Sequence, residues 1–128
     1  MITKDLRTYL LTLPAITTIT SQIHPGVLPQ NPTLPAIVYQ TSGAASGIAF
    51  DGPDGARNSQ IQLDTYAATI TASASLAEAI KTALHGYTGS MDSTTVYQTI
   101  VDSIYDVFES DTGLYRVSLD LSIWHKEA

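Results

Sequence analysis

The segment Tyr115–Trp124 alternates between core-forming and mostly polar side chains without a break, and this constrains the fold more than any other feature of the sequence. A period of two residues is typical of a β-strand with one buried face. We therefore expect a strand whose apolar side packs on a core. The expected inward residues are Tyr115, Val117, Leu119, Leu121 and Ile123, and the expected outward residues are Arg116, Ser118, Asp120, Ser122 and Trp124.

Three other segments have the composition of strands. Ala36–Thr41 is rich in apolar and β-branched residues, Ser59–Ala67 alternates strictly, and residues 96–108 alternate with some irregularity. A loop at Glu109–Gly113 joins the long segment to the final strand. In Ser59–Ala67 we expect one face to pack and the other to be wet or at an interface. The packed face carries Ile61, Leu63 and Thr65, and the other carries Gln60, Gln62, Asp64 and Tyr66.

Two segments have helical periodicity. Apolar residues between Leu6 and Leu13 recur at helical spacing before Pro14, which itself can begin a further short turn. A longer helix is expected from Thr71, as its N-cap, to a stop at Gly86. These patterns predict an α+β fold. We expect about four mostly antiparallel strands in a sheet, two main helices packed on one face, and a long loop between the first two strands.

The segments between these elements are unusual. Prolines at four positions exclude a helix from His24 to Pro35, which predicts either a stiff connector or an arm that lies on a neighbouring subunit. The stretch 42–56 is rich in Gly, Ala and Asp and is longer than most loops in compact domains. Its large apolar residues, Ile48 and Phe50, are available to contact a partner or to fold back on the core.

Composition and charge exclude several classes of protein. A chain of 128 residues fits one domain, residues 1–128, and its net charge of −6 comes entirely from residues 64–128. Six scattered Lys and Arg form no basic stripe for binding nucleic acid tightly. No apolar run is long enough to span a bilayer, and without cysteine a disulfide scaffold, a cysteine nucleophile and a thiolate zinc site are excluded. The N-terminus also lacks the pattern of a secretory leader.

The sequence gives little support for a catalytic or metal-binding role of any residue. His24, His85 and His125 lie outside any metal-ligand motif, so structural or solvated roles are favoured for all three. Asp51 and Asp54 could offer carboxylates to a calcium ion, but their spacing is not that of a calcium loop, and Asx turns are the simpler interpretation.

A second group of acidic residues lies near the end of the long strand segment. On a regular strand, Asp102 and Asp106 would share one face about 13 Å apart, too far to act on one bond. Together with Glu109 and Asp111 they are better interpreted as an acidic surface.

Several fragments, in this order, resemble the tail-terminator (tail-completion) proteins of long-tailed bacteriophages. They begin with Asp5-Leu-Arg-x-Tyr-Leu and continue with His24-Pro-Gly-Val-Leu-Pro-Gln and Leu34-Pro-Ala-Ile-Val-Tyr-Gln. The stretch Gln60–Thr69, the Ala/Leu-rich helix and the closing segment Asp111–His125 follow. Residues 43–58 and 87–96 match loosely. Gln22 stands where relatives often carry a charge, so a salt bridge made there in relatives is expected to be missing.

The resemblance implies a structural protein without catalytic residues or a cofactor. Such proteins form a ring, usually a hexamer, that caps the finished tail tube and meets the head-completion protein, and genomic DNA passes through its hole. The implied partners are further copies of the chain, the tail tube protein and the head-completion protein, with no membrane. The implied location is the head-proximal end of the tail in the virion, after assembly in the host cytoplasm.

A ring suggests roles for particular residues. Because each subunit must offer two different contact faces, the loop and outward residues become candidates for the subunit or tube interface. These are Ile48, Phe50, Arg57, Tyr66, Arg116 and Trp124. Acidic side chains along a hole would repel passing DNA. The candidates for this lumen are Asp102, Asp106, Glu109, Asp111 and Asp120. Two alternatives remain: an accessory binding module that uses the 43–58 loop, and a small metal-dependent enzyme built on Asp51 and Asp54.

Overall fold

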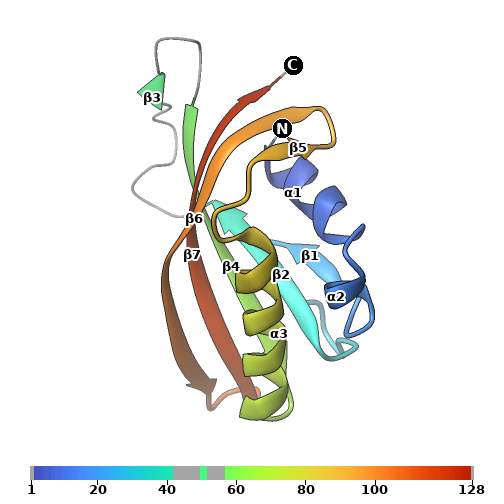
Figure 1. Cartoon of the computed structure of the whole chain (residues 1–128). Helices are drawn as coiled ribbons and strands as arrows, with labels where there is room; N and C mark the ends of the chain where they lie inside the picture. Colours follow the sequence, from blue (N-terminus) through green and yellow to red (C-terminus); the bar gives the residue numbers. More distant parts are fainter. Residues whose placement is uncertain (1, 42–49, 52–56, 128) are drawn as a thin grey trace.

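The computed structural model describes residues 2–41, 50–51 and 57–127, and it has the expected α+β architecture (Figure 1). Among these residues, six strands follow one another across a sheet in the order β1-β2-β4-β7-β6-β5, and β3 pairs with β4 beside this path. The strands are β1 (Ile23–Pro25), β2 (Ala36–Thr41), β3 (Phe50–Asp51), β4 (Arg57–Ala67), β5 (Gly89–Met91), β6 (Thr94–Glu109) and β7 (Leu114–Glu127).

The four strands expected from the sequence form the centre of this sheet. They are β2, β4, β7 and β6, which are neighbours in that order and antiparallel throughout. The expected count of four was too low. The three further strands are only two or three residues long, which is too short for an alternation of apolar and polar residues to indicate a strand. One of them, β1, lies in the proline-rich segment and pairs in parallel with β2.

The helices cover one side of the sheet, as expected (Figure 1). They are α1 (Ile2–Leu10), the short α2 (Pro14–Thr17) and α3 (Ile70–Leu84). α3 lies mainly on β7 and β4, whereas α1 lies against β5 and β2. One hydrophobic cluster joins them to the inner face of the sheet, where Leu63, Leu119 and Ile80 are fully buried. None of the helices in the described residues is long and apolar enough to cross a membrane.

The N-cap of α3 is Thr69 and not Thr71. The side chain of Thr69 accepts a hydrogen bond from the backbone N–H of Ala72 at 3.1 Å, and its backbone is extended as a cap requires. Thr71 lies inside the helix. Both residues are threonines within one turn of the helix start, so composition did not distinguish them.

Two irregularities interrupt the pairing of β6 with β7 and explain the uneven alternation of residues 96–108. One lies between Val96 and Gln98 and the other between Val101 and Ser103. Each adds an unpaired residue, which reverses the face on which later side chains lie. Figure 1 shows β6 bending over the top of the molecule to reach β5 beside α1, while the β6–β7 turn lies at the opposite end.

Candidate functional site: the outer face of the sheet

The face of the sheet turned away from α3, here called the outer face, carries the polar side chains predicted from the alternation of β4 and β7. The register places Gln60 beside Ser122, Gln62 beside Asp120, Asp64 beside Ser118 and Tyr66 beside Arg116. The residues between them on β7 are buried in the core. The alternation therefore predicted correctly which side chains share this face, and the register with β7 comes from the structure.

Hydrogen bonds join these side chains across three strands. The Gln60 Nε2 group donates to Asn58 Oδ1 at 2.7 Å and to Ser122 Oγ at 2.8 Å. Ser122 in turn donates to a carboxylate oxygen of Asp102 on β6. Nearby, Ser103 Oγ donates to Asp120 Oδ2 at 2.8 Å. The outer face thus carries small groups of hydrogen-bonded polar side chains, in which serines hold carboxylates in place.

Asp64 lies at the centre of this surface and is only 1% exposed. Its Oδ1 accepts hydrogen bonds from Ser118 Oγ at 2.6 Å and from Gln62 Nε2 at 2.9 Å, and Arg116 NH1 lies 3.7 Å from its Oδ2. A buried carboxylate needs such partners because desolvation disfavours its charge. The expectation that this whole face would be wet or at an interface is wrong here, since Asp64 is enclosed within the subunit itself.

Tyr66 is buried in the same region, with 9% of its surface exposed. Burial raises the pKa of its hydroxyl above the ordinary value, and the negative charges of Glu109 and Asp64 raise it further. Arg116 opposes this shift through its charge and a hydrogen bond. Tyr66 is therefore held as a neutral phenol inside the subunit, which leaves little of its ring for a partner.

The acidic residues of β6 do not share one face, contrary to the prediction for a regular strand. Asp102 adjoins the second irregularity and hydrogen-bonds to Ser122 on the outer face, whereas Asp106 pairs with Val117, an inward residue. The extra residue in β6 separates them. Glu109 is half-buried near Tyr66 on the outer face, and Asp111 is exposed in the turn.

The structure describes the side chains of only some of the predicted interface residues. Arg116 and Trp124 are half-buried on the outer face. The backbones of Phe50 and Arg57 are described by their strand pairing, but their side chains lie outside the described part, as does Ile48 entirely. Sequence reasoning missed the apolar side chains that β6 leaves exposed, and their only signal was its irregular alternation. They are Tyr97, Ile104, Tyr105 and Phe108.

The three histidines have separate structural environments. His85 Nδ1 accepts a hydrogen bond from the backbone N–H of Val101, and the His125 ring is buried with Nε2 2.7 Å from Ser59 Oγ. His24 lies on β1. No three His, Asp or Glu side chains in the described residues lie close enough together to hold a metal ion. Of the calcium candidates, Asp54 and the side chain of Asp51 lie outside those residues.

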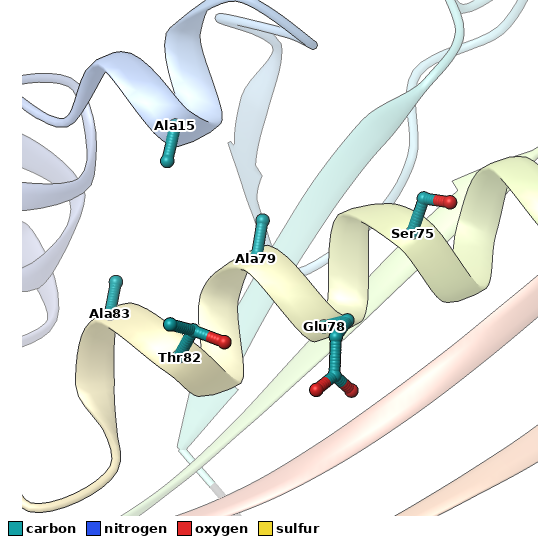
Figure 2. A pocket seen from close by; sticks show the side chains of 6 residues that line it. All are labelled: Ala15, Ser75, Glu78, Ala79, Thr82 and Ala83. Carbon is teal, nitrogen blue, oxygen red and sulfur yellow. The ribbon is translucent and has the colours of Figure 1, made fainter.

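A groove of about 430 Å³ lies between α2 and α3 (Figure 2). In Figure 2, Ala15 of α2 points toward the surface of α3 that carries Ala79 and Ala83. The remaining lining side chains, from Ser75, Glu78 and Thr82, offer one carboxylate and two hydroxyls. Because no histidine, lysine or second carboxylate lines it, the groove lacks a general base paired with a nucleophile.

Two comparisons with known proteins give a match over nearly the whole chain. A family model described as "Tail completion protein gp17" matches residues 4–126. A chain from the solved structure "Virion of native gene transfer agent (GTA) particle" has the same fold, with a TM-score of 0.66 and 10% sequence identity. That match covers 96% of this chain and 95% of the other. No curated protein matches the sequence.

Proposed function

The chain belongs to the family of the tail completion protein gp17, and from this membership we propose that it forms a ring that caps the phage tail tube as a single domain of residues 1–128. Membership makes it a structural component of a phage-like virion, associated with other virion proteins, and not an enzyme. The family match over nearly the whole chain is the observation that carries the proposal.

The proposed ring, a hexamer, ends polymerisation of the tube and joins the tail to the head-completion protein. Its partners are further copies of the chain, the tail tube protein and the head-completion protein. It occupies the head-proximal end of the tail after assembly in the host cytoplasm. Closed rings use heterologous contacts, so two different surfaces of each subunit meet.

We further propose that the outer face of the sheet lines the hole through which DNA passes. Asp102, Glu109 and Asp120 lie on this face, and Asp111 extends from the turn at its end. Carboxylates in a confined passage repel phosphates, which keeps DNA from adhering without specific binding. Asp106 lies on the opposite face and is not part of this surface.

The remaining interface candidates stay proposals for contacts with a neighbouring copy or the tube. Arg116 and Trp124 are half-buried in the subunit, so each keeps some surface for contact with a neighbour or the tube. Ile48, Phe50 and Arg57 remain candidates from the sequence. They belong to the 43–58 loop on which the accessory-module alternative also depends.

Deleting the gene and imaging the tails by electron microscopy tests the proposal. We expect tubes of unregulated length, or tails of normal length that fail to join heads, and restoration of both by the gene supplied in trans. An inactive version with a stop codon after residue 35 is the matched control. If virions made without the protein had tails of normal length joined to heads, the proposed function would be contradicted.

A further inference from the structure

The second half of β6 is an unpaired edge of the sheet. From Ser103 to Glu109 it pairs with β7 on one side, Asp102 being the unpaired residue just before, and within the described part of the chain no strand lies on its other side. In an antiparallel ladder every second residue points its backbone N–H and C=O away from the paired neighbour. Residues 102–109, here called the distal edge, therefore present a row of backbone donors and acceptors to the surroundings.

The first half of the same edge is closed within the subunit. β5 pairs with Thr94–Val96, the backbone N–H of Gly86 donates to the Thr99 carbonyl at 2.7 Å, and that of Val101 donates to His85 Nδ1 at 3.1 Å. The end of α3 thus covers the edge up to Val101. The distal edge begins where this cover ends, at the second irregularity of the strand.

Apolar side chains flank the distal edge on both faces. Ile104 and Phe108 pair with the inward residues Leu119 and Tyr115, while Tyr105 pairs with Ser118 on the outer face. Phe108 is 54% exposed, and Ile104 and Tyr105 are 41% and 43% exposed. Natural proteins usually cover, shorten or charge an edge of this kind, because it is a template for another chain.

The charge of the distal edge limits what can cover it. Residues 102–113, the edge and the turn after it, contain Asp102, Asp106, Glu109 and Asp111 and no basic residue. A two-fold contact between two distal edges would bring these carboxylates against their own copies, which is unfavourable. This repulsion favours a different surface as the partner of the edge, one that is uncharged or basic.

An uncharged surface of this chain lies at the other end of the sheet. Residues 8–50 contain no Asp, Glu, Lys or Arg, and they include α2 and β1. β1 ends the strand order opposite β6 and β5 (Figure 1). Val27, which follows β1, is 76% exposed, the highest value among the large apolar side chains described, and Ile19 after α2 is also exposed. Residues 19–34 are here called the uncharged edge.

We propose that the distal edge of one copy docks on the uncharged edge of the next copy in the ring. This inference rests on the ring proposed above and names its subunit contact. The two surfaces are different and lie on opposite sides of one sheet, so the contact is heterologous and passes from copy to copy until the ring closes. It buries Phe108, Ile104 and Val27 and brings acidic side chains toward residues 19–34, which carry no formal charge themselves and whose Ile23 carbonyl accepts a hydrogen bond from Arg7 Nε.

Cysteine crosslinking tests this contact directly, because the chain has no cysteine of its own. We would place Phe108→Cys and Val27→Cys in one gene, purify phage particles that carry the variant, and treat them with a flexible bismaleimide. The expected result on a denaturing gel is a ladder of dimers, trimers and higher species. Each single variant, treated in the same way, is expected to remain at the monomer mass because its cysteine faces a surface without one.

The outcomes separate this contact from the function on which it rests. Native mass spectrometry of the untreated particles' tail complexes counts the copies of the chain. Multiple copies without a ladder would overturn the contact and leave the ring intact. A single copy per tail would overturn both. Crosslinked dimers in the Phe108→Cys single variant would indicate a two-fold contact between distal edges and would also overturn the proposal.

A charge substitution gives a second measurement. Phe108→Lys is expected to raise the concentration needed for ring assembly at least about tenfold, as expected for an aromatic side chain at the centre of an interface. Tyr97→Lys is the matched control, since Tyr97 is on the same strand and 44% exposed but belongs to the first half of the edge, which is covered within the subunit. Thermal unfolding of both variants would establish that they fold. Equal assembly by the two variants would contradict the proposal.

Discussion

At the scale of single residues, Asp64 shows how the outer face differs from an ordinary solvated surface. Its carboxylate is enclosed by Ser118, Gln62 and Arg116, and it stands beside the buried ring of Tyr66. Such a network is satisfied within the subunit, so it stiffens the face without needing a ligand. Alternation predicted the side on which these residues lie, but not that the side would be enclosed.

The burial of Tyr66 predicts how stability depends on pH. Since its pKa is raised in the folded protein, the folded state keeps a proton that the unfolded chain loses first, and the free energy of unfolding falls as pH rises above 10. We expect Tyr66→Phe to lose less stability than the parent over this range. Urea unfolding between pH 8 and pH 11 measures both curves. Curves with identical slopes would show that the burial of Tyr66 does not contribute.

At the scale of elements, the irregularities of β6 decide which side chains lie on which face. The sequence pattern predicted the existence of this strand and its turn, and its uneven alternation indicated a departure from regular pairing. It could not specify where the extra residues lie, because the residues of β6 alone do not show which of them pair with β7. The choice depends on pairing with β7 and β5 and on the cover supplied by the end of α3.

The start of α3 provides a test at the same scale. Thr69→Ala removes the side-chain acceptor for the Ala72 N–H and is expected to cost about 1 kcal/mol of stability. Thr71→Ala, the matched control within the first turn, is expected to change stability by less than about 0.5 kcal/mol. Urea unfolding of the two variants measures the difference. The reverse order would mean that Thr71 is the N-cap after all.

At the scale of the whole molecule, the acidic residues and the segment without formal charge lie toward opposite edges of one sheet. Acidic residues gather on the outer face and the distal edge, whereas residues 8–50 are without formal charge. Such a division suits a subunit that meets its neighbours through two different surfaces and presents a third to a passing polyanion. Low charge content, unusual for a protein exposed on all sides, is consistent with enclosure by other copies.

The proposed acidic lumen predicts how reversal of charge alters the assembled ring. Asp102→Lys combined with Asp111→Lys is expected to make rings retain DNA at low salt, with binding that weakens as salt rises. Glu78→Lys combined with Asp92→Lys, at exposed positions away from the outer face, makes the same change in net charge and serves as the control. Filter binding at several salt concentrations compares them. Equal retention by both pairs would show that the outer face does not line the hole.

The sequence by itself determined the α+β class, the four central strands, the faces of β4 and β7, and the two main helices. These features follow from hydrophobic periodicity, which can be recognised within one segment without knowing what that segment packs against. It also supplied the family resemblance and argued against enzymatic chemistry. Only the tertiary structure decided the short strands, the enclosure of Asp64, the separation of Asp102 from Asp106 and the exposure of the distal edge. These features depend on which segments meet across the sheet. Contacts between residues distant in sequence produce no periodic pattern within a single segment, so the sequence does not reveal them.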